Sequence, residues 1–390
     1  MASCEIPVGG EERMQKRRKG LGKTCIKCKR DAGALVLRGL VYCRPCTEAL
    51  VVQRFRKVID DHIPPNSASS SILAIAYSGG LGSTLLLELV ANILGSSSTR
   101  SRKHRWDHID VIYVDQSAIE DLSGYQGPSS AEVQRIVTSY PDFRLTQVPL
   151  EACFDEGSDV QPSRLLRSHI QSIPTRTGMV DSINLLTRRL LERTAKSLGA
   201  THLILGRNMS SLSIALLSNI CSGRGASISD ETVASWNGLL SFNPLRDLGS
   251  KECASYVYWK NLKVISRVNS LEDWSGTSAS ISHLTREFIT GLERDYPSTV
   301  STITKTCAKV SPRGDRPSQC SLCYRPMKSA TDEDSQQHAV AILASSPRDA
   351  PGTLCYACNV LFTSSNSKSL FSGGLEVPMP IWSSRPADLE

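Results

Sequence analysis

No part of this 390-residue sequence forms a long hydrophobic run. A membrane-spanning helix needs about 20 consecutive apolar residues, and a secretion signal needs a shorter apolar segment after its basic residues. The sequence contains neither, so we expect a cytoplasmic protein without a membrane partner. Internal repeats are also missing, apart from two cysteine-rich modules. With 40% hydrophobic residues, the chain can still bury a sizeable core in about two to three domains.

Positive charge is concentrated at the N-terminus. Residues 1–30 hold nine lysines and arginines against three glutamates, which gives +6 of the total net charge of +7. A polyanion would therefore meet this segment first, although a solvated tail that only aids solubility is the alternative. We predict a basic, disordered arm over residues 1–20 that contacts RNA phosphates through Lys16, Arg17, Arg18 and Lys19.

Eight of the thirteen cysteines form four Cys-x-x-Cys pairs. Two residues between thiolates form a knuckle that points both sulfurs at one ion, and two knuckles complete the tetrahedral shell of a structural zinc. Redox or chance pairs are the alternative, and an acidic insertion separates the two C-terminal pairs. A filled Cys4 shell has no open coordination position, so such ions stabilise a fold without performing chemistry. The predicted zinc ligands are Cys25, Cys28, Cys43 and Cys46 in a module over residues 21–63, and Cys320, Cys323, Cys355 and Cys358 in a module over residues 307–362.

A glycine-bearing turn follows the first strongly apolar segment. Residues 72–77 (ILAIAY) are typical of a buried strand, residues 78–84 (SGGLGST) of a turn, and residues 85–90 of a helix. Glycines let the backbone approach an anion closely, and Ser83 and Thr84 can cap a helix whose free N–H groups favour negative charge. This pattern predicts a phosphate-binding turn, with an ordinary βα turn as the alternative.

Strands and helices alternate through the segment that follows. The alternation predicts an α/β fold over residues 72–300, with a parallel sheet, helices on both faces and ligands at the carboxyl ends of the strands. We predict strands over residues 72–77, 108–114, 143–148 and 201–205, helices over residues 50–59, 131–140, 180–198 and up to 220, an irregular segment over 151–178 and a disordered tail over 363–390. The candidate cofactor-binding residues are Ser78, Gly79, Gly80, Gly82, Ser83, Asp115 and Gly206.

Several motifs together resemble one known superfamily. The order S-G-G-x-x-S resembles the PP-loop of ATP pyrophosphatases, which cleave ATP between its α and β phosphates. With Asp115, the turn Gly206-Arg207-Asn208 and cysteine knuckles at both ends, the chain is similar to the tRNA thiolation branch of these proteins. Residues 244–252 are similar to the P-[LM]-R-D-L-x-x-K-E element of the cytoplasmic tRNA 2-thiolation protein 2 family. The resemblance covers most of residues 21–362.

This resemblance implies an adenine nucleotide α-hydrolase-like fold and a subunit of a heterodimeric tRNA thiolase. In such an enzyme, an active PP-loop paralogue uses ATP and magnesium to adenylate the C2 carbonyl oxygen of uridine 34. Sulfur from a thiocarboxylated ubiquitin-related modifier then replaces AMP. The product is the 2-thio group of 5-methoxycarbonylmethyl-2-thiouridine in the tRNAs for Lys, Glu and Gln.

The sequence departs from the active pattern in both turns. Active thiolases have S-G-G-K-D-S, whereas this chain has Leu81 and Gly82 in place of the lysine and the aspartate. The later turn has Met209-Ser210-Ser211 where active relatives have A-D-D. Leucine cannot neutralise a phosphate, and glycine offers no carboxylate to a metal ion. The backbone N–H groups could still bind ATP, but we expect no fast adenylation.

Two single cysteines and two arginines complete the candidate residues. Cys221 and Cys153 lie where related enzymes place catalytic cysteines, but isolated cysteines are more often buried core residues. Arg224 and Arg246 are candidate RNA-phosphate contacts, and a salt bridge to Asp247 or to a sheet neighbour is the alternative for Arg246. We predict a non-catalytic PP-loop partner subunit that helps to bind tRNA. The alternatives are a self-sufficient ATP-dependent thiolase that uses Cys221, and a zinc-stabilised protein scaffold that binds no RNA.

Overall fold

The computed structural model describes residues 24–37, 39–63, 72–94, 106, 108–123, 127–154, 160–265, 281–310, 318–320, 322–323, 325–327, 354–362 and 380. The chain divides into two compact units, residues 1–49 and 50–390, which we describe separately. The predicted basic arm with Lys16, Arg17, Arg18 and Lys19 lies outside the described residues, as does the predicted tail apart from Pro380. None of the described helices is both long and apolar enough to cross a membrane.

A short antiparallel hairpin forms the centre of the first unit. β1 (Leu35–Leu37) pairs with β2 (Leu40–Tyr42), and an isolated bridge joins Thr24 to Ala32. The helix α1 (Arg44–His62) begins directly after this hairpin and continues into the second unit. The predicted helix over residues 50–59 is confirmed, because its apolar residues are buried at helical spacing: Val51, Phe55, Val58 and Ile59.

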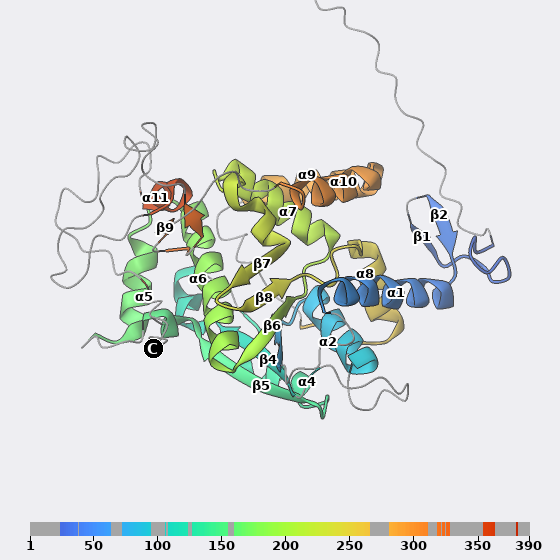
Figure 1. The fold of residues 1–390 in the computed structure, drawn as a ribbon, viewed down its shortest axis with the longest axis horizontal. Coiled ribbons are helices and arrows are strands. Elements are labelled where there is room, and N and C mark those ends of the chain that lie inside the picture. Colours follow the sequence, from blue (N-terminus) through green and yellow to red (C-terminus); the bar gives the residue numbers. More distant parts are fainter. Residues whose placement is uncertain are drawn as a thin grey trace, which may run out of the picture. The chain divides into compact units, whose positions relative to one another are not determined.

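One six-stranded sheet with the strand order β5-β4-β3-β6-β8-β7 supports the second unit (Figure 1). All neighbouring strands are parallel except β7, which pairs with β8 in the antiparallel direction. The four parallel strands predicted from the apolar runs are confirmed. The strand bounds are Ile72–Ala76 for β3, His108–Asp115 for β4, Phe143–Pro149 for β5, Ala200–Leu205 for β6, Val233–Trp236 for β7 and Leu239–Phe242 for β8.

The edge hairpin of β7 and β8 was not predicted. Asn237 and Gly238 connect these strands, and both have positive φ angles, 46° and 78°. Such angles at both central positions define a type I′ turn, for which Asn-Gly is the preferred sequence. The Asn-Gly pair between two short apolar segments was therefore the signal for this hairpin.

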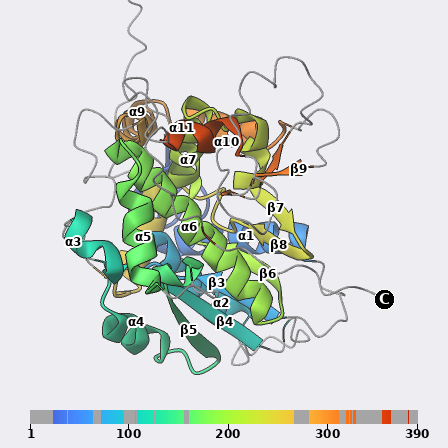
Figure 2. The ribbon, with the colours of Figure 1, turned by 90° about the vertical axis from the view of Figure 1, so that its left-hand side faces the viewer.

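Helices cover both faces of the sheet, as predicted. Ala74 and Ala76 of β3 belong to the hydrophobic cluster that contains the buried residues of α6, whereas Leu73 and Ile75 belong to the cluster that contains those of α2. Figure 2 shows α5 and α6 together over the first of these faces. The longer helices are α2 (Leu81–Leu94), α4 (Ser130–Val137), α5 (Pro162–Gln171), α6 (Arg176–Ser197), α7 (Met209–Cys221), α8 (Ser250–Trp259), α9 (Ile281–Asp295) and α10 (Pro297–Cys307). The shorter elements are η1 (Ser117–Ile119), α3 (Glu120–Ser123), η2 (Leu150–Phe154), η3 (Gly225–Glu231), β9 (Ser318–Gln319), β10 (Pro326–Met327) and α11 (Tyr356–Phe362).

The segment predicted as irregular over residues 151–178 contains regular structure, so that prediction was wrong. Its described part includes most of η2, all of α5 and the start of α6. A proline occupies the start of α5, where its fixed φ favours a helix and its missing N–H costs no hydrogen bond. Leu166 and Ile170 are buried four residues apart on α5, which is helical spacing.

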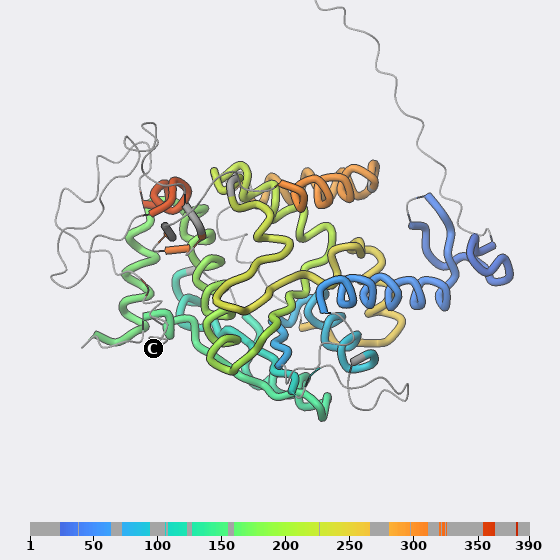
Figure 3. The backbone as a smooth tube through the Cα atoms, in the orientation of Figure 1, coloured from blue at the N-terminus to red at the C-terminus, as the bar shows by residue number. Residues whose placement is uncertain are grey.

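α9 and α10 pack on α7, and Figure 3 shows the three helices beside one another. Met209 of α7 clusters with Ile289 of α9 and Val300 of α10, and Leu216 of α7 clusters with Cys307 of α10. This packing matters for the site because α7 begins directly after the turn that follows β6.

Candidate functional site

The predicted ligand-binding turns lie along one edge of the sheet. β4, β3 and β6 are neighbours, so Asp115, Ser78 and Gly206 lie at the carboxyl ends of three adjacent strands. The carboxylate of Asp115 accepts hydrogen bonds from the backbone nitrogen of Ser117 at 2.9 Å and from the hydroxyl of Ser130 at 3.2 Å. Asp115 therefore holds the start of η1 and the start of α4 at this edge.

The first turn of α2 differs from the predicted capping arrangement. α2 begins at Leu81, so Ser83 and Thr84 lie inside the first helical turn, where both are buried. The Ser83 hydroxyl donates to the carbonyl oxygen of Gly80 at 3.0 Å and lies 3.4 Å from the Ser78 hydroxyl. The predicted cap was wrong, because a hydroxyl that donates to a carbonyl does not satisfy a free N–H of the helix start.

The backbone of the turn over residues 78–84 packs directly against the backbone of the turn that follows β6. A Cβ atom on Gly82 would lie 1.9 Å from the carbonyl oxygen of Gly206, and a Cβ atom on Gly206 would lie 2.5 Å from the backbone nitrogen of Ser83. Real Cβ contacts are essentially never shorter than 3.0 Å, so this backbone has no room for a side chain at either glycine. Gly82 occupies the position at which the S-G-G-K-D-S motif of active thiolases has aspartate. The neighbouring turn therefore occupies the space that such a side chain would need.

Apolar groups cover another side of the same turn. Gly79 has a φ of +72°, which glycine adopts readily, and its carbonyl oxygen accepts a hydrogen bond from the backbone nitrogen of Ile265 at 3.0 Å. A Cβ atom on Gly79 would lie 3.0 Å from a side-chain carbon of Ile265 and from one of Pro128. At Gly80, by contrast, a Cβ atom would meet only the hydroxyl oxygen of Ser78 at 3.6 Å. Of these loop glycines, Gly80 offers the most open approach for an anion.

The turn after β6 contains an ion pair that the sequence did not predict. Arg207 donates to one carboxylate oxygen of Glu231 at 2.5 Å, and Arg325 binds the other oxygen. The Glu231 side chain is only 6% exposed. Burial alone would raise the pKa of Glu231, but Arg325 and Arg207 outweigh burial and hold this pKa well below its ordinary value. Glu231 is therefore a charged carboxylate that fixes the position of Arg207. The sequence did not predict these ion pairs, because Arg207 and Arg325 are distant from Glu231 in the chain.

The first cysteine quartet assembles as its spacing predicted. The four ligand sulfurs lie within 4.8 Å of one another, and those of Cys28 and Cys43 are 3.7 Å apart. Metal–sulfur bonds of about 2.3 Å in a tetrahedron place the sulfurs about 3.8 Å apart, whereas a disulfide needs about 2.05 Å. The spacing therefore fits a single tetrahedral ion. The quartet consists of Cys25, Cys28, Cys43 and Cys46.

The second cysteine quartet has the same geometry. Its four sulfurs also lie within 4.8 Å of one another, and those of Cys323 and Cys355 are 3.8 Å apart. The backbone nitrogen of Cys355 donates to the Cys320 sulfur at 3.3 Å, as is usual for a knuckle that holds thiolates. A four-iron cluster would place its ligand sulfurs further apart, because an iron–iron edge separates them. The quartet consists of Cys320, Cys323, Cys355 and Cys358.

The two single cysteines proposed as thiol candidates lie in contrasting surroundings. Cys221 is the last residue of the 13-residue helix α7 and is exposed, so the expectation of a core cysteine was wrong there. Because α7 rises 1.5 Å per residue, Cys221 lies about 18 Å along the helix from the turn at Gly206. Cys153 is buried, and this burial raises the pKa of its thiol to about 12. Cys221 is therefore far from the carboxyl edge of the sheet, whereas Cys153 follows β5 at that edge but is buried.

The two arginine candidates also differ. Arg224 is buried and forms an ion pair with Asp181 at 3.2 Å. Contrary to the prediction, its side chain is therefore not accessible to an RNA phosphate. Arg246 is half-buried, and its Nη1 donates to the Nε2 of His62 at 3.0 Å instead of binding Asp247. Burial lowers the pKa of His62 most, and the positive charge of Arg246 lowers it further. The salt bridge given as the alternative for Arg246 is thus replaced by a bond to a neutral imidazole.

Residues 244–252, which resemble the P-[LM]-R-D-L-x-x-K-E element, connect α1 to α8 through side-chain hydrogen bonds. Arg246 binds His62 of α1, and the Glu252 carboxylate accepts from Arg54 of α1 at 2.7 Å. The other Glu252 oxygen accepts from the backbone nitrogen of Gly249 at 2.8 Å, at the start of α8. With only 5% of its side chain exposed, Glu252 positions two helices and is largely shielded from solvent.

Comparison with known proteins agrees with these features. Cytoplasmic tRNA 2-thiolation protein 2 of Danio rerio is 25% identical and covers 83% of this chain and 76% of its own length. The protein of the same name from Coccidioides immitis is 25% identical over 86% of this chain and 96% of its own. A family model described as cytoplasmic tRNA 2-thiolation protein 2 matches residues 280–351.

A solved structure gives the same class of fold. The U34-tRNA thiolase NcsA from Methanococcus maripaludis, solved with its [4Fe-4S] cluster, covers 83% of this chain and 98% of its own, with a TM-score of 0.57 and 14% identity. The parallel sheet, the glycine turn and this likeness define a PP-loop-like α/β protein that carries two Cys4 clusters. Along most of its length the chain is similar to curated proteins named cytoplasmic tRNA 2-thiolation protein 2, in agreement with the resemblance predicted from the motifs.

Proposed function

We propose that this chain is the partner subunit of a heterodimeric tRNA thiolase that modifies wobble uridine 34 in the cytoplasm. The relatives named cytoplasmic tRNA 2-thiolation protein 2 and the structural likeness to a U34-tRNA thiolase support this function. In the proposed enzyme, an active PP-loop paralogue adenylates the uridine, and a ubiquitin-related modifier supplies the sulfur. The substrates are the tRNAs for Lys, Glu and Gln, and this chain helps to bind them.

The contact between Gly82 and Gly206 supports a role without ATP scission in this subunit. Adenylation needs cations that neutralise the developing phosphate charge. The loop has Leu81 in place of the lysine, and the backbone of the next turn fills the space beside Gly82. The cation of that next turn, Arg207, is already bound to the carboxylate of Glu231. Both charged groups required by the active loop are therefore replaced by apolar or main-chain atoms.

We further propose that each cysteine quartet holds one structural zinc ion. Four thiolates at tetrahedral spacing are the preferred shell of zinc and leave no open position for a substrate. In the first quartet the ion would join the hairpin of β1 and β2 to the start of α1, because Cys43 and Cys46 flank this junction. In the second it would join the segment around Cys323 to the start of α11.

Contact with tRNA is assigned to the basic arm. Lysine and arginine contacts to phosphates release counterions and give salt-dependent binding, which suits a segment rich in these residues. Arg246 stays a secondary candidate, because its partner His62 is neutral and does not offset its charge. Arg224 is withdrawn, since it is buried and paired with Asp181.

AMP formation from ATP tests the catalytic part of the proposal. The isolated chain should form no AMP above background with tRNA present, whereas the heterodimer should form AMP and 2-thiouridine. Replacing the loop lysine of the paralogue should abolish both, and Ser78→Ala in this chain should leave AMP formation intact. Uridine-dependent AMP formation by the isolated chain that is lost in Cys221→Ser would instead establish a self-sufficient thiolase.

Crosslinking to tRNA tests the binding part. The heterodimer should lose most of its crosslink to this chain when Lys16, Arg17, Arg18 and Lys19 are all replaced by glutamine. Replacement of four exposed lysines of the second unit by glutamine, at Lys251, Lys263, Lys305 and Lys309, provides a matched control for loss of positive charge. A crosslink that never forms on this chain would support the protein scaffold without RNA binding.

A further inference from the structure

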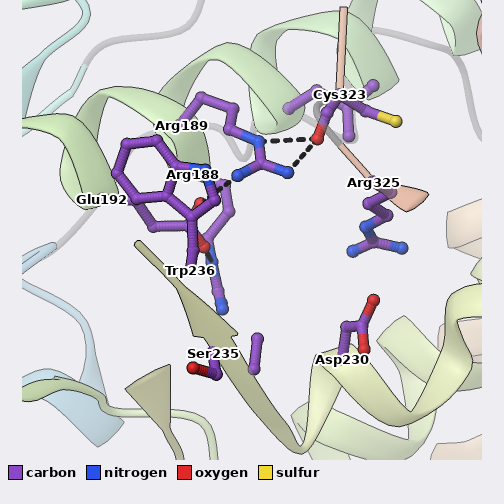
Figure 4. Close-up of a pocket in the computed structure, with 10 residues that line it drawn as sticks. Arg188, Arg189, Glu192, Asp230, Ser235, Trp236, Cys323 and Arg325 are labelled. Carbon is purple, nitrogen blue, oxygen red and sulfur yellow. Dashed lines mark hydrogen bonds and ion pairs between the residues drawn. The ribbon is translucent and has the colours of Figure 1, made fainter. Parts of the chain in front are cut away.

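The second cysteine quartet lies at a junction with α6. Arg189 of α6 donates from its Nε to the carbonyl oxygen of Cys323 at 2.6 Å, and its Nη2 binds the same oxygen. Figure 4 shows this guanidinium group directed at the Cys323 carbonyl, beside a cavity of about 130 Å³ that Trp236 of β7 also lines. The position of one metal ligand is thus tied directly to a helix of the α/β core.

A second connection runs from the quartet to the turn after β6. Arg325, two residues beyond Cys323, binds the hydroxyl of Ser227 at 3.1 Å and the carboxylate of Glu231. The other oxygen of Glu231 binds Arg207, which directly follows the glycine that lies against Gly82. A continuous series of bonded side chains therefore links the metal-ligating segment to the carboxyl edge of the sheet.

Most charges of this junction are paired with one another, with four arginines facing three carboxylates. Each guanidinium group is bound by a carboxylate or a carbonyl, although the Nη1 of Arg188 is buried without a partner, and the carboxylates of Glu192 and Glu231 are nearly fully buried. A divalent ion with four thiolates carries a charge of roughly −2, which suits neighbouring guanidinium groups. The junction contains the cations Arg188, Arg189, Arg207 and Arg325 and the anions Glu192, Asp230 and Glu231.

We infer that metal binding by the second quartet fixes the turn Gly206-Arg207-Asn208, with Arg325 and Glu231 as positioning residues. The loaded quartet holds Cys323, and hence Arg325, at the distance at which Glu231 binds Arg325 and Arg207 together. Without the ion, the segment that carries Arg325 separates from η3, and the Arg207 turn becomes more mobile. This inference rests on the proposed metal site and does not depend on tRNA thiolation.

Hydrogen exchange of the full-length chain, combined with metal analysis, tests the inference. The wild-type chain should contain two metal ions. Cys355→Ser should lose one ion and increase amide exchange in peptides over residues 203–212 by at least tenfold. The matched variant Cys46→Ser should also lose one ion but leave exchange in these peptides unchanged.

A second pair of variants separates the side-chain link from metal loss and from misfolding. Glu231→Gln should keep both ions and still increase exchange over residues 203–212. Glu192→Gln is the control, because Glu192 is as buried as Glu231 and also binds two arginines but does not contact Arg207. Its exchange in these peptides should match that of the wild type.

Three results would overturn the inference. These are a second quartet that binds no metal in the wild type, unchanged exchange in Cys355→Ser after loss of one ion, or equal effects of Glu231→Gln and Glu192→Gln. Wobble-uridine thiolation, measured separately, reports on the proposed function. A chain that shows the predicted exchange but supports no thiolation would retain this inference and lose the functional proposal.

Discussion

The contact between Gly82 and Gly206 makes a quantitative prediction about stability. In Gly82→Ala the new Cβ would start 1.9 Å from the Gly206 oxygen, so the two turns must separate by at least about 1.1 Å to reach the 3.0 Å limit. Overpacking of this kind costs about 1–3 kcal/mol. For a domain of 150–250 residues, each kcal/mol lowers Tm by about 2–4 °C, so we expect a fall of about 2–12 °C.

Gly80→Ala is the matched control in the same turn. A Cβ on Gly80 meets only the Ser78 oxygen at an ordinary contact distance of 3.6 Å, and Gly80 does not have a positive φ. Alanine there should be neutral, or should stabilise by about 0.4–1 kcal/mol through the unfolded chain.

Thermal unfolding and urea titration of both variants measure the effect. Gly206→Ala should also destabilise, because its Cβ would lie 2.5 Å from the Ser83 nitrogen. The double variant of Gly82 and Gly206 should cost less than the sum of the two single changes, since both relieve the same contact by separating the same turns. If Gly82→Ala unfolds at the same temperature as Gly80→Ala, the proposed closure of the loop is refuted.

Three further predictions concern individual side chains. In the native chain, N-ethylmaleimide should modify the exposed Cys221 within minutes and leave the buried Cys153 unmodified until unfolding, as read by mass spectrometry; equal labelling would contradict the described burial. His62 has a lowered pKa, so the folded state binds fewer protons than the unfolded state, and stability should fall as pH drops below about 6.5. Arg246→Gln should raise the His62 pKa in an NMR titration and weaken this pH dependence, whereas an unchanged pKa would remove Arg246 as a cause. Cys46→Ser should lose one metal ion and expose residues 24–49 to limited proteolysis, and persistent protection would show that the ion is not structural.

The sequence predicted those parts of the fold that depend on local patterns. The apolar residues 72–76 and 203–205 indicated buried parallel strands, and the structure has both. The helix α5 was missed because its apolar residues are few and its surroundings are polar. The hairpin at Asn237 and Gly238 was missed although its turn sequence was informative, because each of its strands has only four residues.

The candidate site divides in the same way. Cysteine spacing predicted both quartets, because two residues between thiolates determine a local knuckle geometry. The ion pairs of Glu231 were not predictable, since its partners Arg207 and Arg325 lie 24 and 94 residues away in the chain. The contact of Gly82 with Gly206 likewise follows from the adjacency of β3 and β6, which local sequence does not encode.

The turn after β6 is held from two sides, and this restricts how the chain can contribute to a reaction. On one side the Gly206 backbone lies against Gly82, and on the other Arg207 is bound to the buried carboxylate of Glu231. A catalytic edge must exchange substrate and product, and the parts of a protein that move in such steps have low local stability. Here the corresponding turn is fixed by main-chain packing and by an ion pair between Arg207 and a nearly fully buried carboxylate. A rigid edge of this kind supports the proposal that this chain orients a partner or a tRNA, while the proposed paralogue carries out the phosphate chemistry.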